Sequence, residues 1–238
     1  MSRNTRDTSS IRTVNVKKDF CPASKGSVLF EMGNTRVICA AHVSDDVPVH
    51  AKEKGTGWVT AEYSMLPYST SPRTPRRLAR PDGRSVEIQR LIGRSLRRAV
   101  DLRKLEGYSI VVDCDVLQAD GGTRTAGITG GFIALRLAVS RMLEEKMLQE
   151  DPIIAAVAAI SVGYVDNRLH LDLDYSLDSR ADVDMNVVMD SNFDLVEVQG
   201  TGENRSFSMK QLDQMMSLAR NGIEQLFTIQ RDITKMIQ

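Results

Sequence analysis

The spacing of hydrophobic and polar residues changes several times along this chain, and each change predicts a strand or a helix. Two apolar runs, 27–32 and 35–43, flank the dipeptide Gly33-Asn34. Because glycine and asparagine tolerate positive φ, we predict a β-hairpin over these runs. Further apolar runs over 58–66 and 108–117 predict two more strands.

Apolar residues at helical spacing lie on both sides of the predicted strand 108–117, so we predict one helix before it and one after it. A third helix is predicted from residue 208 onward, where methionines serve as core residues rather than as ligands. The three apolar stripes are Ile88, Leu91, Ile92, Leu96 and Ala99; Ile128, Phe132, Leu135, Ala138 and Leu143; and Leu212, Met215, Met216, Ala219, Ile223, Leu226 and Phe227.

Apolar and polar residues alternate in two later segments, 169–175 and 182–187. This period of two predicts two half-buried strands whose aspartates share one face. The order strands, helix, strand, helix, strands, helix predicts an α/β fold with mixed sheets, hairpins and crossover helices. The chain has 238 residues, 42% of them hydrophobic, and no obvious linker, so we expect a single domain over 1–238.

The segment 118–127 reads Gln-Ala-Asp-Gly-Gly-Thr-Arg-Thr-Ala-Gly and joins a predicted strand to a predicted helix. Two adjacent glycines let backbone N–H groups turn toward one point, where the helix adds unpaired donors and the positive end of its dipole. This arrangement predicts an anion site with Arg124 as its fixed charge. The loop lacks both the lysine of a phosphate-binding P-loop and the spacing of a dinucleotide fingerprint. A tight turn with Thr123 or Thr125 as helix N-cap is the alternative.

Charge is balanced over the whole chain, with 31 basic and 31 acidic residues, but it is unevenly distributed. Residues 73–103 hold ten arginines and three acidic residues, for a net charge of +7, whereas 171–198 hold eight acidic residues and one arginine, for −7. An arginine-rich segment broken by prolines fits a polyanion such as nucleic acid. A solvated face or a subunit interface is the alternative for four arginines at helical spacing, Arg90, Arg94, Arg97 and Arg98.

The acidic strands point to a divalent cation. A solvated strand face is the plain alternative for each aspartate, but carboxylates that converge near phosphate would repel it unless a cation lay between them. Oxygen ligands of this kind suit Mg²⁺. A histidine-based zinc site is not expected, because the chain has only three histidines, His42, His50 and His170.

Five blocks of the chain resemble, in the same order, the signature blocks of the ribonuclease PH family. They are 57–67, 83–94, 113–125, 183–187 and 198–202, which read GWVTAEYSMLP, GRSVEIQRLIGR, DCDVLQADGGTRT, VDMNV and VQGTG. The resemblance covers nearly the whole chain and implies a ribonuclease PH-like catalytic domain. It further implies a phosphate-dependent 3′-to-5′ exoribonuclease that trims tRNA precursors, releases nucleoside diphosphates and runs in reverse as a nucleotidyltransferase.

The resemblance also implies a role for individual residues and for partners. Inorganic phosphate, the co-substrate, would be held by Arg84, Gly122, Thr123 and Arg124. Asp178 and Asp184 would be catalytic and would hold Mg²⁺ or Mn²⁺, and Asp184 is a candidate to protonate the leaving 3′ oxygen. The RNA partner, chiefly tRNA 3′ ends, would contact Arg73, Arg76 and Arg77. The family implies a homo-oligomer, a hexamer formed as a trimer of dimers.

Four positions depart from the family pattern. Gly127 stands where a serine is usual, Leu177 where a glutamate is usual and Tyr68 where a basic residue is usual, while 3–6 lacks the family's Asp-Gly-Arg. The first change removes a hydroxyl next to the glycine loop, and the second removes a charge near the proposed metal. Two alternative functions stay open: a metal-dependent hydrolytic nuclease on the same acidic strands, and a catalytically silent RNA-binding ring subunit.

The location of the protein is predicted from its apolar segments. The longest apolar run, 153–162, is too short to span a bilayer, and the first ten residues lack the apolar core of a secretory signal. We therefore expect a cytoplasmic protein with no membrane partner. The three cysteines are too scattered for a disulfide framework, and we expect Cys39 and Cys114 to be buried and reduced.

Overall fold

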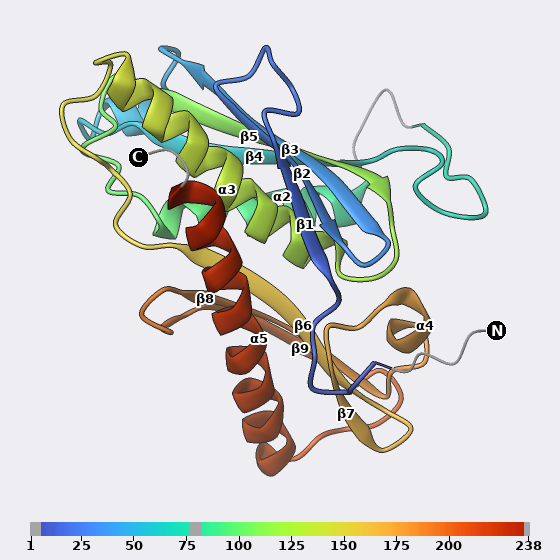
Figure 1. The fold of residues 1–238 in the computed structure, drawn as a ribbon. Coiled ribbons are helices and arrows are strands. Elements are labelled where there is room, and N and C mark those ends of the chain that lie inside the picture. Colours follow the sequence, from blue (N-terminus) through green and yellow to red (C-terminus); the bar gives the residue numbers. More distant parts are fainter. Residues whose placement is uncertain (1–5, 77–81, 236–238) are drawn as a thin grey trace.

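The computed structural model describes residues 6–76 and 82–235, which form two β-sheets and the helices that pack on them (Figure 1). The first sheet has the strand order β1-β2-β3-β5-β4. Its β4 and β5 run parallel, and its other neighbouring strands run antiparallel. The strands are β1 (Val14–Lys18), β2 (Gly26–Met32), β3 (Thr35–Ser44), β4 (Trp58–Met65) and β5 (Ser109–Gln118).

The predicted hairpin over 27–32 and 35–43 is confirmed. Strands β2 and β3 pair antiparallel from Gly26↔Ala41 to Met32↔Thr35, so that Gly33 and Asn34 form the turn. Gly33 has a φ of +59°. Its missing side chain also makes room for Arg12, because a Cβ there would lie 2.5 Å from the arginine's Cδ. Glycine is therefore required in this turn both for its positive φ and for the space that the Arg12 side chain occupies.

The second sheet is antiparallel throughout and has the strand order β7-β6-β8-β9. One predicted strand, 169–175, is wrong at its far end. Strand β7 stops at Leu171, because Asp172 adopts a φ of +55° and Asp174 caps a short helix by accepting a hydrogen bond from Leu177 N. The elements here are β6 (Val157–Val165), β7 (Arg168–Leu171), α4 (Tyr175–Asp178), β8 (Val183–Asp190) and β9 (Leu195–Thr201).

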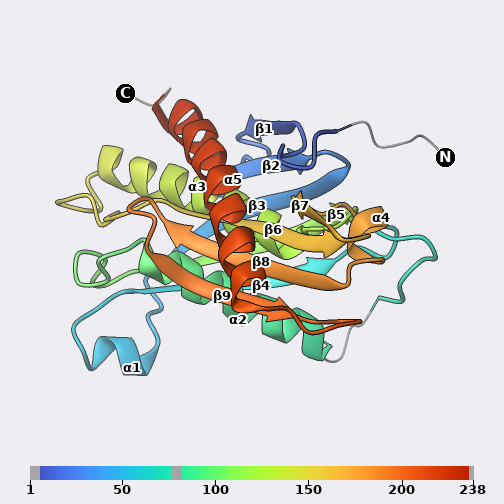
Figure 2. The same cartoon turned by 90° about the horizontal axis from the view of Figure 1, so that it is seen from below.

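Two long helices lie between the sheets, and a third covers the outer face of the second sheet (Figures 1 and 2). Helix α3 packs closely on both sheets: a Cβ at Gly26 of β2 would lie 2.3 Å from Ala134 O, and Thr129 exchanges hydrogen bonds with Ala159 of β6. On the other side of β6, Gly222 lies against Ile160. The helices are α1 (Val49–Lys52), α2 (Gly83–Arg98), α3 (Thr123–Glu144) and α5 (Met209–Lys235).

Helix α3 is the centre of the core. By length and composition it could cross a membrane, but 83% of its most apolar 18-residue stretch is buried inside the protein. One apolar cluster includes residues of both sheets and of α2, α3 and α5. Cys39 and Cys114 form a cross-strand pair in this cluster, and both are buried free thiols, as predicted. The expectation of a single domain stays a prediction.

Candidate active site

The glycine loop has the geometry that an anion site needs. Gly121 and Gly122 have φ values of +74° and +66°, a conformation that other residues adopt only with strain. Gly122 is the N-cap of α3, and no side chain in the described ranges caps this helix end. The alternative with a threonine N-cap is wrong: Thr123 is the first helical residue, and Thr125 Oγ1 donates to Gly122 O at 2.9 Å. The first N–H groups of α3 are therefore free to bind an anion.

The glycine loop packs against the chain that leads into α4. A Cβ at Gly121 would lie 2.4 Å from Leu173 O and 2.8 Å from Tyr175 N, so only glycine fits at this contact. Asp120 Oδ1 also accepts a hydrogen bond from Tyr175 N at 3.3 Å. Because α4 ends at Asp178, this contact brings the phosphate side of the predicted site next to its carboxylate side.

Arg84 and Arg124 lie in the first turns of two helices, α2 and α3. Asp82 caps α2 by accepting from Ser85 N at 2.7 Å, and Arg84 follows it in the first turn of that helix. Arg124 Nη1 donates to Gln199 Oε1 at 3.0 Å and lies 3.8 Å from Glu87 Oε1. Sequence reasoning missed Gln199, although it lies inside the VQGTG block. Its contacts orient the Arg124 guanidinium and leave the arginine half-buried.

The charges of neighbouring site residues act on both aspartates: Arg84 and Arg124 on Asp178, and Asp178 and Arg124 on Asp184. Burial raises the pKa of Asp178, and the charges of Arg84 and Arg124 act against that rise. Burial also raises the pKa of Asp184, and the charges of Asp178 and Glu203 add to it. Neither carboxyl therefore loses its proton as readily as an isolated aspartate. Raised carboxyl pKa values of this kind are common at sites that bind a cation or transfer a proton.

The described residues fit a divalent cation that keeps part of its shell for water or substrate. Asp184 Oδ1 is buried and has no hydrogen-bond partner among them. They contain no group of three or more His, Cys, Asp or Glu side chains close enough to hold a metal ion. Mg²⁺ in phosphoryl-transfer sites commonly uses only one or two carboxylates and completes its shell with water and substrate phosphate. Asp178 and Asp184 match that donor set.

Tyr63 is a further component of the site that sequence reasoning missed. Its ring is buried on β4, and its hydroxyl lies 2.8 Å from Oγ1 of Thr123. Burial raises the pKa of the phenol, while the Thr123 hydrogen bond and the charges of Arg84 and Arg124 lower it. The contact could not be inferred from spacing, because the two residues are 60 positions apart.

The chain that leads into the arginine-rich segment, residues 66–76 in the described part, is attached to the glycine loop. Ala119 N donates to Ser69 O at 2.8 Å, so this chain starts beside the loop's first residues. Within it, the Arg73 guanidinium lies 5.6 Å from the centroid of the Tyr68 ring, and both Tyr68 and Arg76 are exposed. Arg77, the third predicted RNA contact, lies outside the described residues.

Arginines farther along α2 contact groups within the chain. Arg94 Nε lies 2.7 Å from Glu197 Oε2, and Arg98 Nη2 lies 3.2 Å from Asp190 Oδ2. Arg97 donates to Val59 O at 2.9 Å. Two of these arginines therefore pair with acidic residues of the same molecule, between α2 and the second sheet.

Two of the positions that depart from the family pattern, Gly127 and Leu177, lie in apolar packing. A Cβ at Gly127 would lie 3.0 Å from Ile92 Cδ1 and 3.8 Å from Cys114, so a side chain there would enter the packing of α3 against α2 and β5. Leu177 is buried in a small apolar cluster with Val165, Leu173 and Ala181. The structure thus assigns packing contacts to both positions.

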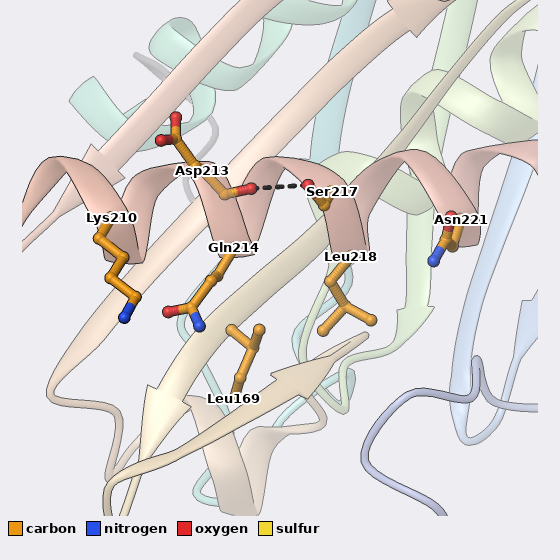
Figure 3. Close-up of a pocket in the computed structure, with 7 residues that line it drawn as sticks. All are labelled: Leu169, Lys210, Asp213, Gln214, Ser217, Leu218 and Asn221. Carbon is orange, nitrogen blue, oxygen red and sulfur yellow. Dashed lines mark hydrogen bonds between the residues drawn. The ribbon is translucent and has the colours of Figure 1, made fainter.

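A shallow groove on the far face of the second sheet is separate from this site. It lies between α5 and β7 and is lined by Leu169, Lys210 and Gln214 among others (Figure 3). Tyr164, whose hydroxyl donates to Gln214, pairs with Val183 in the sheet, whereas Asp184 points to the opposite face. The groove and Asp184 therefore lie on opposite faces of the second sheet.

Comparisons with known proteins identify the class. Models of the 3′ exoribonuclease family match the chain over residues 10–140 (domain 1) and 155–222 (domain 2). The chain belongs to this 3′ exoribonuclease family. It is 50% identical over 230 residues to "Ribonuclease PH" of Syntrophomonas wolfei, covering 96% of both chains, and 49% identical over 225 residues to "Ribonuclease PH" of Crocosphaera subtropica, covering 94% of both. These matches make the chain a phosphate-dependent 3′-to-5′ exoribonuclease of the ribonuclease PH type.

Solved structures share the same fold at lower identity. The rice protein Rrp46 superimposes with a TM-score of 0.78 at 14% identity and 99% coverage of both chains. A chain of the Archaeoglobus fulgidus exosome, determined with RNA bound to its active site, gives a TM-score of 0.78 at 22% identity, with 98% of this chain and 91% of that chain covered. The predicted mixed α/β, ribonuclease PH-like fold is therefore confirmed.

Proposed function

We propose that this exoribonuclease trims the 3′ ends of tRNA precursors, with phosphate bound at the glycine loop and the scissile group facing Asp178 and Asp184. The observation that supports the proposal is the direct packing of the glycine loop on the chain entering α4. The charges of Arg84 and Arg124 also act on Asp178. The positive charges and the N–H groups at the start of α3 suit the nucleophile, and the adjacent carboxylates suit the leaving side.

The nucleophile is inorganic phosphate. Arg84, Arg124, the hydroxyl of Thr123 and the N–H of Gly122 would hold its oxygens and reduce their repulsion of the RNA phosphate. One phosphate oxygen forms a bond to the phosphorus of the last phosphodiester, and the bond from that phosphorus to the 3′ oxygen of the preceding nucleotide breaks. The terminal nucleotide leaves as a nucleoside 5′-diphosphate.

The leaving 3′ oxygen needs a proton and neutralisation of its charge. Mg²⁺ or Mn²⁺ held by Asp178 and Asp184 would supply the neutralisation. The raised pKa of Asp184 also makes its carboxyl a candidate proton donor to that oxygen. Metal binding requires the ionised carboxyl and proton donation the protonated one, so a given Asp184 carboxyl serves one of the two roles at a time.

RNA binding and assembly belong to the same proposal. The exposed Arg73 and Arg76, together with Arg77 in the sequence, would contact the tRNA backbone as fixed positive charges. We propose a hexamer formed as a trimer of dimers, in which these arginines lie near the active sites of neighbouring copies.

The test is a product analysis with a 3′-extended tRNA and Mg²⁺, with and without inorganic phosphate. Nucleoside diphosphates are expected only when phosphate is added. Nucleoside monophosphates without added phosphate would instead identify a hydrolytic nuclease, and binding of the tRNA without any product would identify a silent ring subunit. A parallel reaction with an unrelated 3′-extended RNA tests whether tRNA is preferred.

A further inference from the structure

A buried arginine lies beneath the glycine loop, on the side away from the predicted phosphate. The segment before β1 runs from the side of β7 and α4 to the first sheet (Figure 1), and Leu171 N donates to Thr8 O on the way. Arg12, near the end of this segment, is only 8% exposed. Its guanidinium therefore makes its hydrogen bonds with protein groups, which lie at the start of β3, in the glycine loop and just after β7.

One set of partners is the backbone of the glycine loop. Arg12 Nη1 donates to Asp120 O at 2.6 Å, and Nη2 reaches Gly121 O at 3.4 Å. Thr35 supports the same loop: its Oγ1 donates to Gly121 O at 2.7 Å and accepts from Asp120 N at 3.0 Å. Both loop carbonyls are therefore held toward the Arg12 side.

Holding these carbonyls fixes the direction of the next N–H groups. In a planar trans peptide the C=O of one residue and the N–H of the following residue point in opposite directions. With the carbonyls of Asp120 and Gly121 turned to Arg12 and Thr35, the N–H groups of Gly121 and Gly122 point away from them. Those two N–H groups are the ones that the loop offers to an anion beside the start of α3.

The other partner of Arg12 is Asp172, which follows β7. Arg12 Nε and Nη2 reach the two carboxylate oxygens of Asp172 at 2.8 Å and 2.7 Å, and Arg12 N donates to Oδ2 at 2.8 Å. Asp172 is buried, and the next residue is fixed as well, because Leu173 N donates to Ser161 Oγ at 2.9 Å. Burial lowers the pKa of Arg12, but the hydrogen bond and charge of Asp172 outweigh burial and raise it, so the guanidinium stays charged.

We propose that Arg12 is a positioning residue for the proposed phosphorolysis: it aims the anion-binding N–H groups of the glycine loop and fixes that loop against the chain that leads to Asp178. The inference rests on the proposed function of the site. Arg12 acts through backbone carbonyls and Asp172 and is not placed against the substrate.

The first test uses Thr35, because an isosteric change there leaves the buried ion pair intact. Thr35→Val removes the hydroxyl that donates to Gly121 O, whereas the matched variant Thr35→Ser keeps it. We expect Thr35→Val to raise the KM for phosphate severalfold, with the KM for RNA unchanged, and Thr35→Ser to stay within about twofold of the parent. Equal phosphate KM values in folded Thr35→Val and Thr35→Ser would overturn the proposal.

The second test removes the arginine together with its charged partner. Arg12→Met alone would leave Asp172 as an uncompensated buried charge, so the double variant Arg12→Met/Asp172→Asn is used alongside Arg12→Lys. The control is Arg6→Met, because Arg6 donates to Asp172 Oδ2 and to the carbonyls of Leu171 and Asp172 rather than to the glycine loop. We expect at least a tenfold rise in phosphate KM for both Arg12 variants and less than a threefold rise for Arg6→Met.

Calorimetric titration of inorganic phosphate into the RNA-free protein separates this inference from the proposed function. Phosphate binding that weakens in the Thr35 and Arg12 variants, with RNA affinity retained, supports the positioning role. An equal loss in Arg6→Met, or unchanged phosphate binding in the folded Arg12 variants, would contradict it. Absence of diphosphate products from the parent enzyme would instead reject the proposed function, whatever the variants do.

Discussion

The hydroxyl of Tyr63 lies 2.8 Å from Oγ1 of Thr123 and thereby joins β4 to the first residue of α3. Because burial raises the pKa of Tyr63, the phenol is neutral at physiological pH and can donate a hydrogen bond. When Tyr63 donates to Thr123, the single proton of the threonine hydroxyl is free for another acceptor, which in the proposed function is a phosphate oxygen.

Removing the phenol hydroxyl should weaken phosphate binding while the ring stays packed. For Tyr63→Phe we expect the KM for phosphate to rise about fivefold, which corresponds to one hydrogen bond of about 1 kcal/mol. Tyr164→Phe is the control, because Tyr164 donates to Gln214 on the opposite face of the second sheet. Steady-state phosphorolysis at varied phosphate measures both variants, and equal effects would contradict the assignment.

Asp184→Asn should separate activity from stability. We expect phosphorolysis to fall by about a hundredfold or more, because the variant can neither ionise for a metal nor supply an acidic proton. In the metal-free protein at pH 7 we expect a higher Tm than in the parent, because a partly buried charge at Asp184 is removed. Activity assays and thermal unfolding in a chelator measure the two effects, and a lower Tm for the folded variant would contradict this account.

The pH dependence of that difference follows from the direction of the pKa shift. A folded-state pKa above the unfolded value of 3.8 means that the folded protein binds more protons between the two values. The parent therefore loses stability as the pH rises through that window, and the loss is complete above the folded-state pKa. The Tm advantage of Asp184→Asn should shrink as the pH falls through the window. A Tm difference that stays constant across the window would argue against this origin.

Arg73→Gln should change the salt dependence of RNA binding. Each phosphate contact on single-stranded nucleic acid contributes about 0.7 to the slope of log affinity against log salt concentration, so we expect the slope to become shallower by about that amount. Arg231→Gln on α5 is the matched control, because that exposed arginine donates within its own helix to Thr228. Binding isotherms at several salt concentrations give the slopes. An unchanged slope for Arg73→Gln would remove this arginine from the RNA contact.

Neighbouring glycines in α3 should respond in opposite ways to alanine. A Cβ at Gly130 would lie 2.8 Å from Phe30 Cβ and 3.0 Å from Cys39 Sγ, whereas a Cβ at Gly131 has its nearest contact at 3.5 Å, to Val112 Cγ1. Gly131→Ala should stabilise the fold by about 1 kcal/mol through helix propensity, and Gly130→Ala should destabilise it through overpacking. Urea unfolding measures both, and a shared sign would contradict the packing argument.

The sequence predicted much of the fold wherever the pattern of side chains reflects local structure. The β2–β3 hairpin, β4, β5 and the long helices follow from periods of two and 3.6 and from turn residues. The strand predicted over 169–175 ends early at Leu171, and Asp172, with a φ of +55°, binds Arg12 instead. These two residues are 160 positions apart. A single sequence contains no local signal of such a partner.

The site residues could be listed from the signature blocks, but their interactions could not. The sequence indicated Arg84, Arg124, Asp178 and Asp184 as charged groups. It did not indicate that Gln199 orients Arg124. Tyr63 and Arg12 could not be identified from the sequence, because each lies in or near a strand. There a tyrosine resembles an ordinary core residue and an arginine an ordinary surface residue until its polar partner is known.

The position of α3 constrains how the chain can be divided. Helix α3 contacts β2 and β3 of the first sheet and β6 of the second sheet. The family models nevertheless end domain 1 at residue 140 and begin domain 2 at residue 155. A fragment that stops after this helix would expose an apolar surface that normally receives β6, and the remaining fragment would lack the surface on which β6 rests. Each piece would therefore expose apolar surface that the intact chain buries between α3 and the sheets.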